Sequence, residues 1–202
     1  MWVMKLSLKY SGDIFTERTK KYGINFYAYP INHYKNGNRY FFSVIGTIEG
    51  DKKASDSFLV DLKKDKRISK LEVNKEFVNI LISYPLSEIK KADMETYYDQ
   101  TFIHIEPILN SKDGFEYWYV GSFERNKLFQ LSDSAVKHHE GRLISINDSK
   151  LDNISLLNIT PKITEQQKKV IIAAFKHGYY EYPRKVEIKK LAESLGVSYS
   201  TC

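Results

Sequence analysis

The residues whose chemistry suggests a function are four basic side chains close to the C-terminus of the 202-residue chain. They are Arg184, Lys185, Lys189 and Lys190. Such side chains can contact the phosphates of a nucleic acid, and each contact contributes to an affinity that falls as the salt concentration rises. Lysines on a solvated helix face give the same pattern, so these residues alone leave both interpretations open.

The charge of the chain is unevenly distributed. Residues 161–202 contain eight Lys or Arg and four Glu, so they carry +4 of the total net charge of +6. A short basic tail behind a nearly neutral body is typical of a nucleic-acid-binding protein with a separate sensing part. An ordinary lysine-rich surface explains the charge about as well.

Enzymatic chemistry has little support in the sequence. It contains no glycine-rich dinucleotide motif, P-loop, nucleophile elbow or His-Glu-x-x-His motif. Glu106 and Asp113 lie near expected strand ends, where carboxylates usually face solvent. We therefore expect a protein that is not an enzyme, with no catalytic residues and no cofactor.

The histidines do not form a pattern typical of a metal site. His138 and His139 are adjacent, and neighbouring residues of a helix point about 100° apart, so they cannot easily share one ion. His33, His104 and His177 also lack a metal-binding pattern. We expect no bound metal.

Signals for a cellular compartment are few. No run of about 18 apolar residues is present that could span a membrane, and residues 1–8 lack the apolar block and cleavage site of a signal peptide. The single cysteine, Cys202, excludes an internal disulfide framework and fits a reducing environment. These features predict a cytoplasmic protein without membrane contact.

The first 150 residues contain two similar successions of strands and helices. In the first, we predict strands over residues 2–10, 24–34, 39–49, 69–73 and 77–84, and helices over residues 13–22 and 53–65. In the second, we predict strands over residues 77–84, 102–109, 115–122 and 143–146, and helices over residues 87–98 and 125–139. The Asn36-Gly37 pair is a strong signal for a hairpin between two strands.

The order βαββαβ, present twice, predicts an α+β fold with tandem ferredoxin-like units. The first unit, residues 1–85, is expected to be a sensing unit. The second, residues 86–150, shares the strand near residues 77–84, and residues 151–160 form a linker. Aromatic residues on both faces of the strands could line a ligand pocket or a dimer interface, but we favour mutual covering by the two units.

The last forty residues predict helices. Thr164 and Gln167 have the spacing of a capping box, and Val170, Ile171, Ala174 and Phe175 are expected on one face of a helix that ends at Gly178. Tyr179, Tyr180 and Tyr182 could contact a phosphate backbone, but we expect them to pack the following connector against this helix. A second helix begins near Val186, with Ile188, Leu191, Ala192 and Leu195 at spacings of three and four.

A helix-turn-helix explains the residues around the end of this second helix. Two helices that cross closely need a small residue, here Ala192, and a turn residue with positive φ, here Gly196. Leu191, Leu195 and Val197 are then expected in the core. The following residues would begin a third helix in the major groove and reach base edges; they are Ser198, Tyr199, Ser200 and Thr201.

Three stretches of this segment carry a resemblance to a known family: residues 163–167, 173–185 and 191–201. They resemble the bacterio-opsin activator type of archaeal helix-turn-helix domain, and the connector over residues 178–184 is the most distinctive part. Residues 113–118 and 141–146 are similar to the sensing half of such proteins. The resemblance implies a DNA-binding transcriptional regulator with an N-terminal half whose ligand is not evident from sequence.

The chain stops at Cys202, where the resemblance implies that the third helix has only begun. We therefore expect a partial helix-turn-helix domain over residues 161–202, and weak or absent binding to double-stranded DNA if the chain truly ends there. The expected partners are DNA, a small-molecule effector and a second copy of the chain. The alternative is a ligand-sensing or protein-interaction module whose C-terminal helices support dimerisation without binding DNA.

Overall fold

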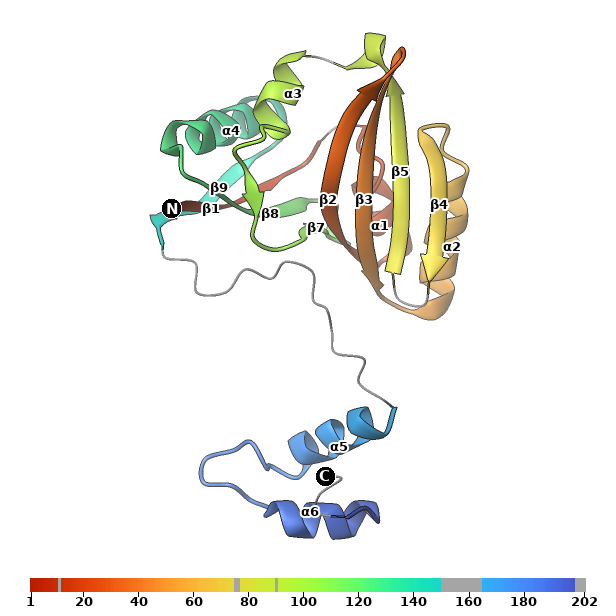
Figure 1. The fold of residues 1–202 in the computed structure, drawn as a ribbon, viewed down its shortest axis with the longest axis vertical. Helices are drawn as coiled ribbons and strands as arrows, with labels where there is room; N and C mark the ends of the chain where they lie inside the picture. The colour runs from red at the N-terminus through yellow and green to blue at the C-terminus, as the bar shows by residue number, and fades with distance from the viewer. Residues whose placement is uncertain (11, 75–76, 90, 150–164, 199–202) are drawn as a thin grey trace. The chain divides into compact units, whose positions relative to one another are not determined.

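The computed structural model describes residues 1–10, 12–74, 77–89, 91–149 and 165–198 (Figure 1). The chain divides into two compact units, Met1–Leu156 and Leu157–Cys202. The N-terminal unit combines helices with an antiparallel sheet, so the expected α+β class is confirmed. Among the described helices, none is both long and apolar enough to cross a bilayer.

The elements of the N-terminal unit follow the expected alternation, with differences at their ends. In chain order they are β1 (Trp2–Leu8), α1 (Thr16–Tyr22), β2 (Asn25–Asn36), β3 (Arg39–Glu49), α2 (Lys52–Lys63), β4 (Ile68–Asn74), β5 (Phe77–Pro85), the 3-10 turn η1 (Leu86–Glu88), α3 (Lys91–Tyr97), β6 (Ile103–His104), β7 (Ile108–Asn110), β8 (Glu116–Ser122), α4 (Arg125–His138) and β9 (Arg142–Asp148). The predicted hairpin is present, because Asn36 pairs with Arg39 and Gly37 has φ 57°.

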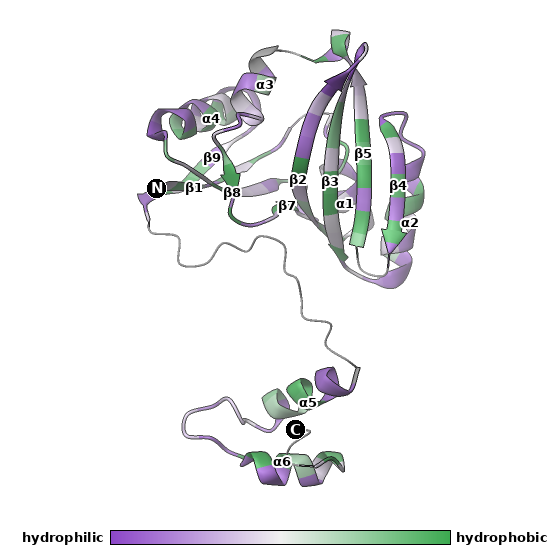
Figure 2. Cartoon of the chain, viewed as in Figure 1, coloured by the Kyte–Doolittle hydropathy of each residue, from purple (hydrophilic) through white to green (hydrophobic). Residues whose placement is uncertain are grey.

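The described strands form a single antiparallel sheet. Its order is β4-β5-β3-β2-β7-β8-β1-β9, and β6 also pairs with β8. Bands of hydrophobic and hydrophilic residues alternate along β3 and β5 in Figure 2, as expected for strands with one face in a core. The sheet therefore joins both predicted units into one structure.

The pairing of β1 corrects the expected division into tandem units. β1 was assigned to the first unit, but it pairs with β8, from Trp2–Ser122 to Leu8–Glu116, and also with β9. In turn, β5 lies between β3 and β4. The halves β4-β5-β3-β2 and β9-β1-β8-β7 thus have equivalent strand orders, with β1 and β5 exchanged between them. The tandem ferredoxin-like arrangement is accordingly not confirmed.

Each half of the sheet has its own hydrophobic core. One core contains Phe26, Phe58 and Ile80, which are fully buried between α2 and the strands β2 and β5. In the other, Leu128 and Leu131 of α4 pack on residues of β1 and β8. Burial of each such side chain contributes about 1.5–3 kcal/mol, so both helices stabilise the sheet that they cover.

The C-terminal unit contains two described helices, α5 (Glu165–Lys176) and α6 (Ile188–Leu195). The predicted cap of α5, Thr164, lies outside the described residues. Gly178, two residues after α5, has φ 71°, and the Tyr179 N–H donates to the Ala174 carbonyl (2.9 Å). This left-handed cap ends α5 where the sequence predicted.

Candidate functional site

The two C-terminal helices contact each other through small and aliphatic residues. Val170 and Ala174 of α5 are buried, and so are Leu191 and Ala192 of α6. Ala192 is only 3% exposed. A side chain of this size lets two helix backbones approach closely, because no larger group separates them.

Gly196 ends α6 in the left-handed region, with φ 64°. Its N–H donates to the Glu193 carbonyl (3.2 Å), and the Val197 N–H donates to the Ala192 carbonyl (3.1 Å). A Cβ at this position would meet no atom within 4 Å. The requirement for glycine is therefore conformational and not a matter of space.

The outer surface of α5 differs from the prediction. Val170 and Ala174 face the core, but Ile171 is 40% exposed and Phe175 is 73% exposed. The spacing of four places Val170 and Ala174 in one row, while each following residue is rotated by about 100° away from it. Of the four residues expected on the apolar face, Val170 and Ala174 are therefore buried, whereas Ile171 and Phe175 are exposed at its edge.

The connector tyrosines also pack less than expected. Tyr180 is 57% exposed and Tyr182 is completely exposed, whereas Tyr179 is half-buried. The Arg184 guanidinium lies 4.8 Å from the centre of the Tyr179 ring. The ring centre of Tyr180 nevertheless lies 5.2 Å from that of Phe175 on α5. The prediction that the three tyrosines pack against the first helix is therefore wrong for Tyr182.

The structure places most of the predicted DNA-contacting side chains on the surface. Arg184, Lys185, Lys189, Lys190 and Ser198 are exposed. Lys185 forms an ion pair with Glu181 (2.5 Å). Leu195 and Val197, predicted for the core, are half-buried, and Tyr199, Ser200 and Thr201 lie outside the described residues.

Comparison with known proteins gives a direct match for this unit. Residues 163–202 match the model of a helix-turn-helix DNA binding domain family, the bacterio-opsin activator type. This C-terminal segment is similar to that family. In the helix-turn-helix domain so defined, α5, the connector with its three tyrosines, and α6 all lie within the matched residues.

A relative with a known role matches a short part of the chain. It is the dimethyl sulfoxide reductase transcriptional activator of Haloferax volcanii, 43% identical over 53 residues. The match covers 26% of this chain and 23% of the relative, so the chain spans under a quarter of the relative's length. No solved structure matches the chain.

The N-terminal unit contains a second candidate site, a pocket of about 330 Å³. Its lining comes from the strands β2, β3, β5, β7 and β8, from α3, and from the segment that follows β1. Many of the lining side chains are aromatic: Tyr10, Phe15, Phe42, Tyr84, Tyr97, Tyr98 and Trp118. This volume is at the lower end of the range for small-molecule sites.

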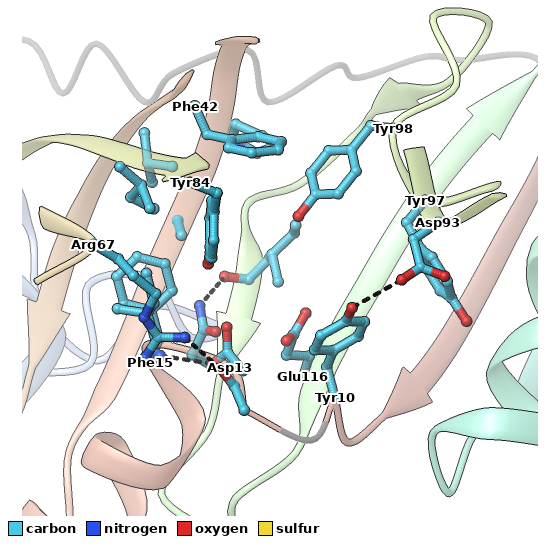
Figure 3. Close-up of a pocket in the computed structure, with 18 of the residues that line it drawn as sticks. Tyr10, Asp13, Phe15, Phe42, Arg67, Tyr84, Asp93, Tyr97, Tyr98 and Glu116 are labelled. Atoms are coloured by element: carbon cyan, nitrogen blue, oxygen red, sulfur yellow. Dashed lines mark hydrogen bonds between the residues drawn. The ribbon is translucent and has the colours of Figure 1, made fainter. Parts of the chain in front are cut away.

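Two carboxylates, Asp13 and Glu116, point into the pocket (Figure 3). Asp13 Oδ2 accepts hydrogen bonds from the backbone N–H groups of Phe15 and Thr16, both at 2.6 Å. Glu116 is 7% exposed, and its Oε2 accepts a hydrogen bond from Trp118 Nε1 (2.7 Å). These bonds fix the orientation of both acids.

The surroundings of the two carboxyl groups favour their neutral forms. Burial, together with the nearby charge of Asp13, raises the pKa of Glu116 to about 8. Burial also raises the pKa of Asp13, although the hydrogen bonds from Phe15 and Thr16 oppose this shift. A carboxyl group with such a pKa titrates close to neutral pH.

Arg67 is the basic side chain among the described lining residues that carries a permanent charge, and it is already occupied. Its Nε and Nη2 donate to the two carboxylate oxygens of Asp65 (2.9 and 2.8 Å), and its Nη1 donates to the Gly12 carbonyl (2.6 Å). These bonds hold the pKa of Asp65 well below its usual range. Arg67 therefore stabilises the wall of the pocket through Asp65 and Gly12, and it forms no ion pair with Glu116 within the described part of the chain.

The sequence did not predict this pocket as a site. Asp13 and Glu116 are separated by about one hundred residues, and no local pattern links them. The aromatic strands were the available signal, because residues on both faces of a strand need covering. Both halves of the sheet contribute side chains to the lining of this cavity.

Proposed function

We propose that the protein is a DNA-binding transcriptional regulator, with the C-terminal helix-turn-helix domain as its DNA-binding part. The match of residues 163–202 to that family carries this proposal. The buried contact of α5 with α6 and the left-handed cap at Gly196 are consistent with a helix-turn-helix. The transcriptional role of the Haloferax volcanii relative supports the same function.

The proposed phosphate contacts are the exposed basic residues Arg184, Lys185, Lys189 and Lys190. Lys189 and Lys190 directly precede the buried pair Leu191 and Ala192 on α6. Because the buried pair faces α5, the two lysines project from the part of α6 that solvent reaches. The residues proposed to reach base edges are Ser198, Tyr199, Ser200 and Thr201.

The N-terminal unit is proposed to sense a small-molecule effector in its pocket. The two units are separately compact, and the cavity combines aromatic walls with a few polar groups, as ligand sites do.

We further propose that the regulator acts as a cytoplasmic homodimer, because a two-fold symmetric protein can match a palindromic operator.

A second candidate function rests on the outer surface of α5. Ile171, Ile172 and Phe175 are exposed there, at 40%, 46% and 73%. Such neighbouring apolar residues are typical of protein contacts. On this interpretation, the C-terminal helices support dimerisation and the chain binds no DNA.

A salt titration of DNA binding tests the first function. We expect the full chain to bind a 30-base-pair duplex at low salt, with an affinity that falls as salt increases. The double variant Lys189→Ala/Lys190→Ala should bind more weakly and reduce the slope of log K against log salt by about one per lost phosphate contact. Fluorescence anisotropy measures both quantities.

The matched control is Lys52→Ala/Lys53→Ala, which removes two exposed lysines from α2. Its binding should equal that of the unmodified chain. The DNA contacts proposed for α6 are wrong if neither the unmodified chain nor the control variant binds duplex DNA at low salt. They are also wrong if both double variants lose the same affinity. The oligomeric state of Phe175→Ser then tests the dimerisation alternative.

A further inference from the structure

The pocket of the N-terminal unit has an acidic interior. Among its described lining residues, Asp13, Glu88, Asp93 and Glu116 are acids, and Arg67 is bound to Asp65 and Gly12. Within the described part of the chain, neither Asp13 nor Glu116 forms an ion pair. A buried charge without a partner is costly, so the empty pocket favours protonated acids and a positive ligand would remove that cost.

The walls of the pocket also suit a positive ligand. The hydroxyl of Tyr98 points toward the same space as the carboxylates of Asp13 and Glu116, and the ring of Tyr84 lies beside it (Figure 3). The rings of Tyr97 and Trp118 line the pocket as well. Aromatic faces attract cations, and this attraction is stronger where water is excluded.

Tyr10 and Tyr84 remain neutral at physiological pH, so they add no negative charge of their own. Burial raises the pKa of both phenols to about 12, and the Tyr10 hydroxyl donates a hydrogen bond to Asp93 Oδ2 (3.2 Å). His104 is also neutral, because burial lowers its pKa to about 4. Its Nδ1 is buried and has no hydrogen-bond partner among the described residues.

An inorganic ion fits the pocket poorly. Metal ions such as Ca²⁺ or Mg²⁺ require several oxygen ligands close together, and the described residues contain no cluster of three or more potential metal ligands. A cavity of about 330 Å³ is also much larger than a single ion. Anions are disfavoured by the two carboxylates, since Arg67 is already occupied.

We propose that this pocket binds an organic cation, an ammonium or similar group on an apolar body, with Glu116 as its counter-ion and aromatic rings as its walls. The proposal rests on the sensing role proposed for the N-terminal unit. Asp13 adds a second acidic group to the same pocket. The apolar body of the ligand would lie against the rings.

Binding of a cation should be coupled to release of a proton from Glu116. In the empty pocket this acid holds its proton up to a pKa of about 8, and a neighbouring positive charge favours the ionised form. The other titratable or charged groups that line the pocket are Asp13 before α1, Tyr10 after β1, Arg67 before β4, Tyr84 on β5, Glu88 on η1, Asp93, Tyr97 and Tyr98 on or beside α3, and His104 on β6. Affinity should therefore rise from pH 6 to pH 8.5.

The test compares the binding of three small probes to the full chain. They are the cation benzyltrimethylammonium, its uncharged carbon isostere neopentylbenzene, and the anion benzenesulfonate. We expect the cation to change the fluorescence of Trp118, which lines the pocket, and the other two to bind at least about tenfold more weakly. Calorimetry in two buffers of different ionisation enthalpy should show proton release with the cation.

Two variants connect this binding to Glu116. Glu116→Gln removes the charge and retains an oxygen that can accept the Trp118 hydrogen bond. We expect it to lose at least about tenfold in affinity for the cation, because the buried cation would lack its counter-charge, and to lose the pH dependence. The control Glu72→Gln changes an exposed acid of β4 that does not line the pocket, and it should bind as the unmodified chain does.

The outcomes separate this inference from the proposed function. Equal binding of the isostere, preference for the anion, absence of cation binding at millimolar concentration, or unchanged binding by Glu116→Gln would each overturn the organic-cation proposal. None of these results affects DNA binding by α6. If the cation binds as expected but leaves the affinity for DNA unchanged, the ligand specificity stands and the sensing role fails.

Discussion

At the scale of single residues, the most unusual feature is a glutamate with little access to water. Glu116 has a hydrogen bond from Trp118 but no ion pair within the described part of the chain. A group in these surroundings links the stability of the protein to pH, because its proton is held more tightly in the folded state than in the unfolded state.

The stability of the free protein is therefore predicted to fall as the pH rises from 6.5 to 8. Unfolded Glu116 releases its proton near its ordinary pKa of 4.5, whereas the folded protein keeps it up to about pH 8. The folded state thus binds more protons in this window, and the free energy of unfolding decreases by up to about 1.4 kcal/mol per pH unit. Urea denaturation at several pH values measures this slope.

Below pH 6.5, another group changes the free energy of unfolding in the opposite direction. His104 has its pKa lowered to about 4, so it increases stability as the pH rises toward 6.5. Asp13, whose pKa is raised, acts in the same direction as Glu116. Glu116→Gln should flatten the slope above pH 6.5, and curves that remain parallel for the variant and the unmodified chain would contradict the prediction.

At the scale of elements, the helix-turn-helix depends on how α6 ends. Gly196 has φ 64° with open space around it. An L-residue other than glycine pays about 1–2 kcal/mol in this conformation, and asparagine pays less than alanine because it visits this region more readily. The end of α6 is thus stabilised by backbone geometry more than by packing.

Gly196→Ala should loosen the last turn of α6 by about 1 kcal/mol, and Gly196→Asn should have a smaller effect. Hydrogen exchange of the amides of Gly196 and Val197 reports the change, because both donate to carbonyls of the last turn. Exchange in β8, which belongs to the other compact unit, is an internal control. If alanine and asparagine had equal effects, the role of the left-handed φ would be wrong.

The elements themselves were largely predictable, but their boundaries were less so. The helix predicted over residues 125–139 is Arg125–His138, because its apolar residues repeat at spacings of three and four. The helix predicted from residue 13 begins at Thr16, since Asp13 instead accepts hydrogen bonds from Phe15 and Thr16. The strand predicted over residues 102–109 is split into β6 and β7.

Long-range pairing was not predictable from local patterns. β1 has apolar residues on both faces, and its periodicity indicates a strand but not its neighbours. The exchange of β1 and β5 and the meeting of Asp13 with Glu116 both depend on contacts between distant segments. In contrast, the helix-turn-helix could be recognised because its informative residues lie within forty consecutive positions.

At the scale of the whole molecule, the exchanged strands should make the N-terminal unit unfold as one body. In sequence, β1 precedes the strands β2, β3 and β4 of the first half, but in the sheet it lies between β8 and β9 of the second half. In the same way, β5 lies between β4 and β3 and completes the first half. Neither half has its full set of strands without the other. A two-state transition is therefore expected for both cores.

Substitutions in either core should shift the same transition. Phe58→Ala and Leu131→Ala each remove a fully buried side chain, one from each core, and should each cost about 2–5 kcal/mol. Both tryptophans, Trp2 and Trp118, belong to the β1–β8 half. If Phe58→Ala left the tryptophan fluorescence transition in place while circular dichroism shifted, independent halves would be indicated.

The exchange of strands also has a consequence for synthesis on the ribosome. β1 is made before its neighbours β8 and β9, which begin only at Glu116 and Arg142. More than half of the N-terminal unit must therefore emerge while Met4, Leu6 and Leu8 still lack the partners that later bury them. A nascent chain of this design depends on β1 staying unpaired until nearly the whole unit has been translated.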